Sequence, residues 1–332
     1  MEYRTLGTSD LQVPTVVFGA WAVGGWYWGP QDDAESIRTL HAALDAGITC
    51  IDTAPMYGMG HSEEVVGRAI KGRRDQVVVA TKCGLRWDTP GEGDEYFTCE
   101  MPDGSKHPVR RNLHKRAILE EVESNLRRLD IDTIDLYQCH WPCKAAPVEE
   151  TMEAMVILKA QGKIREIGVS NFSPELLAQC LEHAPLVSDQ PPYSLLRRDA
   201  EADVLPFCLA HDIGVIVYSP LQQGLLTGKM TPDRELHAND YRRRNKWFTP
   251  QNRQRVLDAL AEIKPIADAH DATFAQTAIA WTVAQPGVTA AIVGARTPEQ
   301  AVENARAGDI QLSADEIRQI RTVFDALGGP VG

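Results

Sequence analysis

Four residues whose side chains can move a proton stand at or just beyond the ends of short apolar runs: Asp52, Tyr57, Lys82 and His140. In an α/β barrel, the C-terminal ends of different strands open onto one mouth, where active sites lie. The four side chains, although far apart in the sequence, are therefore predicted to meet in one pocket. A carboxylate, a phenol, an ammonium and an imidazole are the groups needed to transfer a proton to or from a carbonyl oxygen.

Each of these groups has a role in such a transfer. The reference pKa of a tyrosine is about 10, and the ammonium of Lys82 is expected to lower the pKa of Tyr57 by favouring the phenolate. Asp52 is expected to pair with Lys82, and His140 to hydrogen-bond and orient the carbonyl oxygen. Taken singly, a strand-end aspartate can cap a helix, and the other three can be packing, surface or structural residues. Their joint placement favours catalysis.

Nothing in this set can act as a reductant, so a cofactor must supply the second half of the reaction. No strand-like run is followed by Gly-x-Gly-x-x-Gly, which argues against a Rossmann-type cofactor site. The cysteines are odd in number and lack a Cys-x-x-Cys pair, which favours reduced thiols. Cys139-His140-x-x-Cys143 has no second ligand pair, so no metal site is predicted. A metal-dependent sugar isomerase would need more strand-end carboxylates than Asp52.

The composition indicates a globular protein that acts on small molecules. The 332 residues are 43% apolar and carry a net charge of −12, and this acidity argues against nucleic-acid and anionic-membrane partners. The apolar runs are far shorter than the roughly 18 residues that span a bilayer, and residues 1–4 lack the layout of a signal peptide. We therefore expect a cytoplasmic protein with a small-molecule partner. No assembly signal is visible, which favours a monomer.

Strand-like runs alternate with helical periodicity, the pattern of a parallel sheet covered by helices. Eight such units predict a (β/α)8 barrel in one domain, residues 1–332, with residues 3–13 forming a hairpin at the barrel bottom. The predicted strands are 14–19, 47–52, 77–82, 134–140, 164–170, 187–190, 214–218 and 290–293. The predicted helices are 32–46 (with Asp33 as its N-cap), 62–70, 115–129, 148–161, 174–182, 203–211, 253–270, 275–285, 298–307 and 314–326.

Two connections at the mouth end are far longer than the usual 2–6 residues or so. Residues 83–114 include Trp87, Tyr96, Phe97 and Met101, and residues 221–251 include a basic cluster at 242–246 followed by Trp247 and Phe248. Long aromatic loops over an active face are typical of substrate walls or lids. The alternative is that each is an ordered surface flap.

The chain resembles the aldo-keto reductases over nearly its whole length. The resemblance rests on several motifs in the right order: Asp52-Thr-Ala-Pro-Met-Tyr57-Gly, Ala80-Thr-Lys82, Ile134-Asp-Leu-Tyr-Gln-Cys-His140, Gly168-Val-Ser-Asn-Phe172 and the stretch 294–304. His140-Trp-Pro142, Gln190-Pro-Pro-Tyr193 and Gly224-Leu-Leu-Thr-Gly-Lys229 are most similar to the bacterial general-stress-protein branch, which also resembles potassium-channel β-subunits.

The resemblance implies an oxidoreductase that reversibly reduces an aldehyde or ketone, sugar-derived carbonyls included, to an alcohol. Tyr57 would be the general acid and base, Lys82 its pKa modulator, Asp52 the partner of Lys82, and His140 the carbonyl-orienting group. An NADP(H) cofactor, with NAD(H) as the alternative, would lie extended across the mouth.

The resemblance also implies the cofactor contacts. Ala20 and Trp21 would flank the nicotinamide, Ser170, Asn171 and Gln190 would bind its carboxamide, and Tyr218 would stack on its ring. The pyrophosphate loop would supply Ser219, Leu221, Gln223 and Lys229, with Pro220 and Gly224 as further contacts. The adenosine and its 2′-phosphate would be held by Gly294, Arg296, Gln300, Glu303 and Asn304.

The chain departs from the best-known branch of that family in the eighth loop. A Lys-Ser pair and a later Arg are replaced by Gly294, Ala295 and Gln300, which leaves Arg296 as the local cation for a 2′-phosphate. The tail beyond Ala326 is too short for a large substrate loop. Substrate contacts are therefore expected from the long loops and from aromatic residues, which suit sugar faces or flat apolar carbonyls: Trp21, Trp26, Tyr27, Trp28, Trp87 and Trp141.

A second function is compatible with the same motifs, namely a nucleotide-sensing regulatory subunit with weak reductase activity. The four proton-transfer residues do not separate the two functions, because such subunits can retain them. The acidic composition and the lack of an extended N-terminal segment favour the enzyme.

Overall fold

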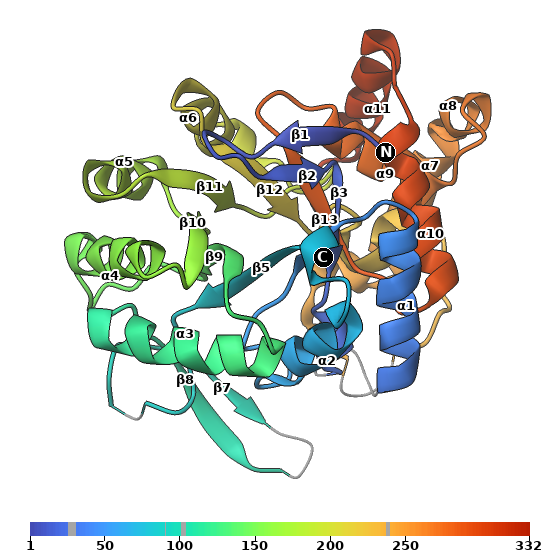
Figure 1. The fold of residues 1–332 in the computed structure, drawn as a ribbon. Coiled ribbons are helices and arrows are strands. Elements are labelled where there is room, and N and C mark those ends of the chain that lie inside the picture. Colours follow the sequence, from blue (N-terminus) through green and yellow to red (C-terminus); the bar gives the residue numbers. More distant parts are fainter. Residues whose placement is uncertain (26–30, 90, 101–103, 237–239) are drawn as a thin grey trace.

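The computed structural model describes residues 1–25, 31–89, 91–100, 104–236 and 240–332. Its centre is a closed barrel of parallel strands in chain order, as predicted (Figure 1). The barrel strands are β3 (Val16–Gly19), β4 (Cys50–Asp52), β5 (Val78–Cys83), β9 (Ile134–Cys139), β10 (Ile164–Ser170), β11 (Leu186–Gln190), β12 (Gly214–Tyr218) and β13 (Ala290–Val293).

Helices surround the barrel and bury their apolar faces against its outer surface. In α3 (Lys115–Leu129), buried Ile118, Val122, Asn125 and Leu129 recur at the three- and four-residue spacing of one helix face. The other helices are α1 (Asp33–Asp45), α2 (His61–Ile70), α4 (Val148–Ala160), α5 (Pro174–His183), α6 (Val204–Ala210), α7 (Pro250–Glu262), α8 (Lys264–Ala269), α9 (Phe274–Val283), α10 (Pro298–Arg306) and α11 (Ala314–Leu327). None of the helices described is long and apolar enough to cross a membrane.

The predicted N-terminal hairpin is confirmed. Strands β1 (Tyr3–Thr5) and β2 (Gln12–Pro14) pair antiparallel, and Leu6, Leu11 and Val13 pack among the inward side chains of the barrel. Gly7 has φ +55°, and a Cβ there would lie 2.3 Å from the Val187 carbonyl oxygen at the start of β11. The hairpin therefore lies directly against the N-terminal ends of the strands.

Two local predictions about helices are wrong. Asp32, not Asp33, caps α1 by accepting a hydrogen bond from the Glu35 amide at 2.8 Å, and Asp33 instead pairs with His61 and Arg68. The predicted helix 253–270 is two helices, α7 and α8, separated at Ile263. Residue 265 is a proline, which has no amide hydrogen to continue the ladder of helical hydrogen bonds.

The first long connection folds into a small sheet. Strands β6 (Leu85–Arg86), β7 (Asp94–Glu100) and β8 (Lys106–Arg111) pair antiparallel in the order β6-β8-β7. In Figure 1 the ribbon of β7 and β8 extends away from the barrel beyond α3. The second connection contains the short helices η4 (Gln222–Thr227), η5 (Tyr241–Arg244) and η6 (Lys246–Phe248). Its Trp247 and Phe248 are buried in the main core and line no part of the mouth cavity, so they are not substrate walls.

Candidate active site

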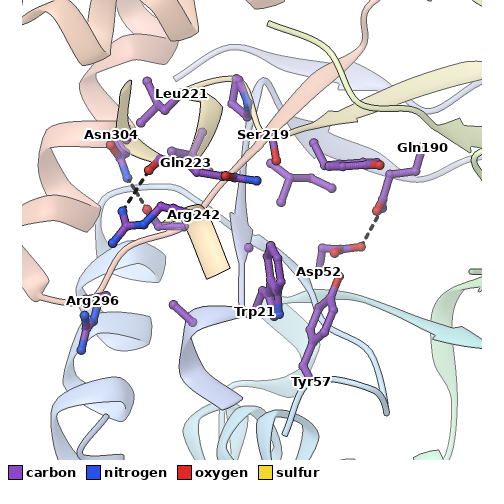
Figure 2. A pocket seen from close by; sticks show the side chains of 18 of the residues that line it. Trp21, Asp52, Tyr57, Gln190, Ser219, Leu221, Gln223, Arg242, Arg296 and Asn304 are labelled. Atoms are coloured by element: carbon purple, nitrogen blue, oxygen red, sulfur yellow. Dashed lines mark hydrogen bonds between the residues drawn. The ribbon is translucent and has the colours of Figure 1, made fainter. Parts of the chain in front are cut away.

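A cavity of about 540 Å³ lies at the C-terminal ends of the barrel strands. Figure 2 shows Asp52, Tyr57 and Trp21 at one end, and Arg296 and Asn304 at the other. The cavity is elongated between these two groups of residues, so an extended ligand would reach both.

Lys82 is the buried centre of the first group. Its Nζ donates to Asp52 Oδ1 at 2.6 Å, to the Thr53 carbonyl oxygen at 3.0 Å and to the Tyr57 hydroxyl at 3.3 Å. The side chain is fully buried and does not line the cavity. Burial acts to lower the pKa of Lys82, but the interactions with Asp52 and Tyr57 outweigh it and raise the pKa. The ammonium therefore stays protonated beneath Tyr57.

Asp52 is held by two amides as well as by the ammonium. Its Oδ2 accepts hydrogen bonds from Gln190 Nε2 at 2.8 Å and from Gln138 Nε2 at 3.2 Å; the Gln190 bond is drawn in Figure 2. Gln190 Nε2 also lies 3.2 Å from Gln138 Oε1. Both carboxylate oxygens therefore have partners, as a buried charge requires.

Tyr57 is a half-buried phenol next to a cation. Its ring lies 6.1 Å from the Trp21 ring and 5.9 Å, edge-on, from the His140 ring. Burial raises the pKa of Tyr57, Lys82 lowers it and Asp52 raises it, and the net direction is upward. The predicted influence of Lys82 is therefore present, but desolvation of the phenolate is larger. Near neutral pH, Tyr57 is therefore a protonated phenol.

The His140 imidazole has one nitrogen for which the described residues provide no partner. Its Nδ1 is buried and makes no hydrogen bond within the described residues. Burial and the Lys82 ammonium hold the pKa of His140 well below its usual value, so the ring is neutral. Buried polar atoms normally have a hydrogen-bond partner. A neutral imidazole that lines a cavity beside a phenol can hydrogen-bond a ligand there.

A chain of hydrogen bonds connects the carbonyl oxygen of His140 to the hydroxyl of Tyr218, which lines the cavity. Asn171 Nδ2 donates to the His140 carbonyl oxygen at 3.1 Å and to Ser170 Oγ at 2.9 Å, and Asn171 Oδ1 accepts from the Tyr218 hydroxyl at 3.0 Å. Ser170 Oγ in turn donates to the Gln190 carbonyl oxygen at 2.8 Å. The side chains of Ser170, Asn171 and Tyr218 are therefore fixed relative to the backbone of His140 and Gln190.

The segment after β12 has unusual backbone geometry. Ser219, Gln222, Gln223 and Gly224 all have φ values between +44° and +95°, in the left-handed region. Successive turns of this kind form concave sites lined by amides that suit anions. Gln223 also has a buried Oε1 without a partner among the described residues, and Lys229, which lines the cavity, lies 3.6 Å from Glu303.

The far end of the cavity is formed by the loop after β13 and by α10. Arg296 Nε donates to Gln31 Oε1 at 2.9 Å, and Gln31 Nε2 donates to the Arg296 carbonyl oxygen at 3.1 Å. Gln300 Oε1 accepts from the Arg296 amide at 2.8 Å, and Asn304 Nδ2 lies 3.3 Å from the Gly294 carbonyl oxygen. The eighth loop is therefore braced by Gln31 and by side chains of α10.

Most residues predicted to contact a cofactor or substrate line this one cavity. They are Trp21, Trp141, Ser170, Asn171, Gln190, Tyr218, Ser219, Pro220, Leu221, Gln223, Gly224, Lys229, Gly294, Arg296, Gln300, Glu303 and Asn304. Ala20 and Trp87 do not line it. Ala20 is fully buried with its backbone bonded to Asp52 and Ser62, and Trp87 packs beside Leu85 and Val109. Trp26, Tyr27 and Trp28 lie outside the described residues.

The cavity also has lining residues that were not predicted as site residues. Arg234 and Arg242 add two cations, and Met56, Leu85 and Phe97 add apolar surface near Tyr57. Arg242 belongs to the basic cluster and Phe97 to the aromatic loop, so both had a signal in the sequence; Arg234 had none. Among the residues that the structure describes, no cluster of three or more His, Cys, Asp or Glu side chains could hold a metal ion.

Comparisons with known proteins point to one family. The profile of the Aldo/keto reductase family matches residues 15–325. The "Aldo-keto reductase YhdN" of Bacillus subtilis is 39% identical, with 100% of this chain and 96% of that protein covered. The "NADH-specific methylglyoxal reductase" of Escherichia coli is 38% identical, with coverages of 98% and 99%.

A plant relative and a solved structure extend the comparison. A "Probable voltage-gated potassium channel subunit beta" of Arabidopsis thaliana is 32% identical, with 96% of both chains covered. The structure of the "glycerol dehydrogenase AKR11B4 from Gluconobacter oxydans" superposes with a TM-score of 0.88 at 37% identity, over 99% of this chain and 97% of that one. With a closed barrel, a matching profile and relatives of nearly equal length, the chain belongs to the aldo/keto reductase family.

Proposed function

We propose that the chain is an NADP(H)-dependent oxidoreductase that reversibly reduces an aldehyde or ketone to an alcohol. The observation that carries the proposal is the cluster of buried Asp52 and Lys82 with half-buried Tyr57, at the end of one elongated cavity. Beside it lies His140, whose Nδ1 has no hydrogen-bond partner among the described residues. This arrangement can hold a carbonyl oxygen and deliver a proton to it. It needs no nucleophile and no metal ligand.

The residues along the cavity fit a nicotinamide dinucleotide. The left-handed segment 219–224 and the cations Lys229, Arg234 and Arg242 suit phosphate groups, although the molecule as a whole is acidic. Ser170, Asn171 and Gln190 would hold the carboxamide, and Tyr218 would lie against the nicotinamide ring. When bound, the cofactor would supply or accept the hydride. Ala20 is proposed only to support the neighbouring backbone beside the cofactor, not to contact the cofactor directly.

In the reduction direction, the side chains have distinct duties. His140, neutral because its pKa is lowered by burial and by Lys82, donates a hydrogen bond that orients the substrate carbonyl. Tyr57, protonated because burial raises its pKa, gives its proton to the carbonyl oxygen as the alkoxide forms. The Lys82 ammonium then stabilises the phenolate left behind, and Asp52 keeps that ammonium in place. Oxidation of an alcohol is the reverse.

The substrate would lie among apolar and aromatic side chains. Trp21, Met56, Leu85, Phe97 and Trp141 line the cavity around Tyr57 and His140. Such walls suit flat apolar carbonyls and the apolar faces of sugar-derived carbonyls. The relatives named for methylglyoxal and glycerol indicate that small carbonyls and polyols belong in the substrate panel.

Cofactor choice is the finer part of the proposal. The cations that line the cavity favour NADPH, which has one phosphate more than NADH. NAD(H) is the alternative, because the Escherichia coli relative is named as specific for NADH. Calorimetric titration with NADPH and NADH separates the two directly.

The decisive experiment is a turnover assay with NADPH and NADH on a panel of aldehydes, ketones and sugar alcohols, using Tyr57→Phe as the matched variant. Tyr57→Phe removes the proton donor but keeps the ring, so cofactor affinity should be unchanged while kcat falls by a factor on the order of 10²–10⁴. Wild-type turnover in Tyr57→Phe would contradict the role of Tyr57.

A regulatory β-subunit-like protein with weak reductase activity is the second candidate, favoured by the relative named as a potassium-channel subunit. It would bind NADPH tightly and show little turnover with every carbonyl tested. The same panel therefore separates the two functions.

A further inference from the structure

A closed ring of side-chain hydrogen bonds lies on the outer face of the barrel behind Lys82. Thr81 Oγ1 donates to Glu63 Oε1 at 2.6 Å, and Arg128 Nε donates to Glu63 Oε2 at 2.7 Å. Arg128 Nη2 donates to Asn125 Oδ1 at 2.9 Å, and Asn125 Nδ2 donates to the Lys82 carbonyl oxygen at 2.9 Å. The ring leaves β5 at Thr81, passes through α2 and α3, and returns to β5 at the next residue.

The sheet itself cannot provide a partner for the Lys82 carbonyl. The Ala80 carbonyl accepts a hydrogen bond from the Thr53 amide at 2.9 Å. Continuing this parallel ladder by one step would pair the Lys82 carbonyl with the amide of residue 55. That residue is Pro55, which has no amide hydrogen. Asn125 supplies the missing donor, so a helix side chain fixes the backbone of Lys82.

The ring is buried and depends on a forked donor. Thr81, Glu63, Asn125 and Lys82 are fully buried, and Arg128 is partly buried. Burial raises the pKa of the Glu63 carboxyl, and the Arg128 guanidinium is the largest opposing influence. A guanidinium can bond Glu63 and Asn125 at the same time, whereas a lysine ammonium lacks that rigid fork.

The ring fixes the backbone from which the Lys82 side chain makes its short contacts with two other residues. Lys82 Nζ must reach Asp52 at 2.6 Å and the Tyr57 hydroxyl at 3.3 Å from one backbone position. A displacement of about 1 Å in a catalytic site can reduce the rate by about 100-fold. The backbone of Lys82 is therefore a point where a distant contact can control proton transfer.

We propose that Arg128 is a positioning residue: by joining Glu63 to Asn125, it fixes the Lys82 carbonyl and keeps the Lys82 ammonium against the Tyr57 hydroxyl. Its effect on turnover depends on the proposed reductase function. Its effect on the geometry of Lys82 and Tyr57 does not.

The test compares Arg128→Met with Arg127→Met. Arg127 is the neighbouring arginine on α3 and is exposed, and its side chain bonds only to Ser124 among the interactions described. Arg128→Met should lower kcat by roughly 10- to 100-fold while the Kd for NADPH and the KM for the carbonyl stay the same. The pH profile of alcohol oxidation should move to higher pH, because Tyr57 loses part of the influence of Lys82. Arg127→Met should match the wild type.

Two further variants keep the test decisive if Arg128→Met folds poorly. Asn125→Asp retains the acceptor for Arg128 but removes the donor to the Lys82 carbonyl, so it should reproduce the loss of kcat. Arg128→Lys keeps the positive charge beside Glu63 without the fork, and should restore thermal stability more than kcat. A purely structural role would instead make kcat follow the melting temperature.

A readout independent of turnover is the NMR signal of ¹³Cζ-labelled Tyr57, assigned with Tyr57→Phe. The signal should shift in Arg128→Met and Asn125→Asp and stay in place in Arg127→Met. An unchanged Tyr57 signal in a folded Arg128→Met protein would overturn the proposal, as would wild-type kcat with an unchanged pH profile. If the wild type reduces no carbonyl, the proposed function fails, and the NMR comparison still decides the role of Arg128.

Discussion

At the scale of single residues, burial disfavours the charge of Lys82 but favours the proton of Tyr57. Burial acts to remove the charge of Lys82 and fails because Asp52 and Tyr57 interact with it. Burial acts to keep the proton of Tyr57 and succeeds, although Lys82 opposes it. The resting site therefore contains an ammonium and a neutral phenol, which is the correct pair for donating a proton to a carbonyl.

Alcohol oxidation, the reverse of the proposed reduction, tests the role of Lys82. Alcohol oxidation needs the Tyr57 phenolate, and the pKa of Tyr57 is already raised by burial with Lys82 as an opposing influence. Lys82→Met should raise that pKa further and move the pH–rate profile of oxidation to higher pH. At a fixed pH below the pKa of Tyr57, the oxidation rate should fall about tenfold if that pKa rises by about 1. Stopped-flow oxidation at several pH values measures this. A pH–rate profile identical to that of the wild type would show that Lys82 does not influence the pKa of Tyr57.

Arg296 offers a residue-scale test of cofactor choice. A hydrogen bond to a charged group contributes about 1.5–3 kcal/mol, so Arg296→Ala should weaken NADPH roughly 10- to 150-fold and leave NADH nearly unchanged, because only NADPH has the 2′-phosphate. Arg306→Ala, at the C-terminal end of α10 and not among the residues that line the cavity, is the control. Calorimetry with both cofactors measures the effect. Equal losses would mean that Arg296 braces the loop through Gln31 instead.

At the scale of elements, the strand and helix ranges could be predicted because apolar periodicity reflects burial directly. Residues 115–129 and 164–170 were predicted with the bounds that the structure has. Contacts between distant segments could not be predicted in this way. The antiparallel pairing of β6, β7 and β8 depends on residues that are mostly exposed or half-buried, which leave little alternation to recognise.

The same reasoning separates the two ends of the site. The four residues predicted to transfer a proton lie at or just beyond the ends of buried strands, whose positions are set by the barrel. Arg234 and Arg242 line the cavity from a long connection, and no local pattern indicates which of its arginines turn inward. Trp247 and Phe248 were expected at the mouth, but η6 buries them in the core, because an apolar ring gains more from the core than from a wet rim.

The β7 strand provides a prediction at this scale. Tyr96 lines the cavity while 39% exposed, with its ring 5.5 Å from the Trp141 ring and the Arg111 guanidinium 5.1 Å from its centroid. Tyr96→Ala should raise KM for aromatic aldehydes roughly 2- to 10-fold, since an aromatic contact contributes about 0.5–1.5 kcal/mol. Steady-state kinetics with aromatic and three-carbon aldehydes measures the change.

The control for Tyr96→Ala is Glu95→Ala, whose side chain is largely exposed on the same strand and bonds to Arg110. Neither variant should alter NADPH affinity. A loss of KM selectivity in Glu95→Ala as well would indicate that the small sheet, rather than the Tyr96 ring, determines the effect.

At the scale of the whole molecule, stability should depend on pH through Glu121 of α3. This carboxyl is buried, accepts the Gly84 amide at 2.8 Å and has a second oxygen without a partner in the described chain. Burial raises the pKa of Glu121 to about 8, despite the opposing Arg86. The folded protein therefore retains a proton that the unfolded chain releases above its ordinary pKa of about 4.5.

The sign of the pH effect follows. Protonated Glu121 makes its full contribution to the free energy of unfolding below about pH 4.5. This contribution declines as the pH rises to about 8, by an amount on the order of a few kcal/mol. Glu121→Gln, which keeps an acceptor for Gly84, should flatten the dependence of the melting temperature on pH between 5 and 8. A Glu123→Gln variant on the same helix, where the carboxylate pairs with Lys163 nearer the surface, is the control. Parallel melting curves for Glu121→Gln and the wild type would refute the assignment.

Two expectations about the whole molecule stay predictions: one domain over residues 1–332, and a monomer. Sedimentation velocity would measure the oligomeric state, and coincident unfolding transitions in fluorescence and circular dichroism would indicate one cooperative unit.

The hairpin of β1 and β2 has a consequence for the order of events in the proposed reaction. Leu6, Leu11 and Val13 fill the lower end of the barrel, and Gly7 lies against β11 without room for a Cβ. Every molecule that reaches Tyr57 must therefore arrive and depart through the mouth. If a dinucleotide lies across that mouth, as proposed, binding is ordered. The carbonyl compound binds after the cofactor, and the alcohol leaves before it. Oxidised cofactor can be exchanged for reduced cofactor only after the alcohol has left.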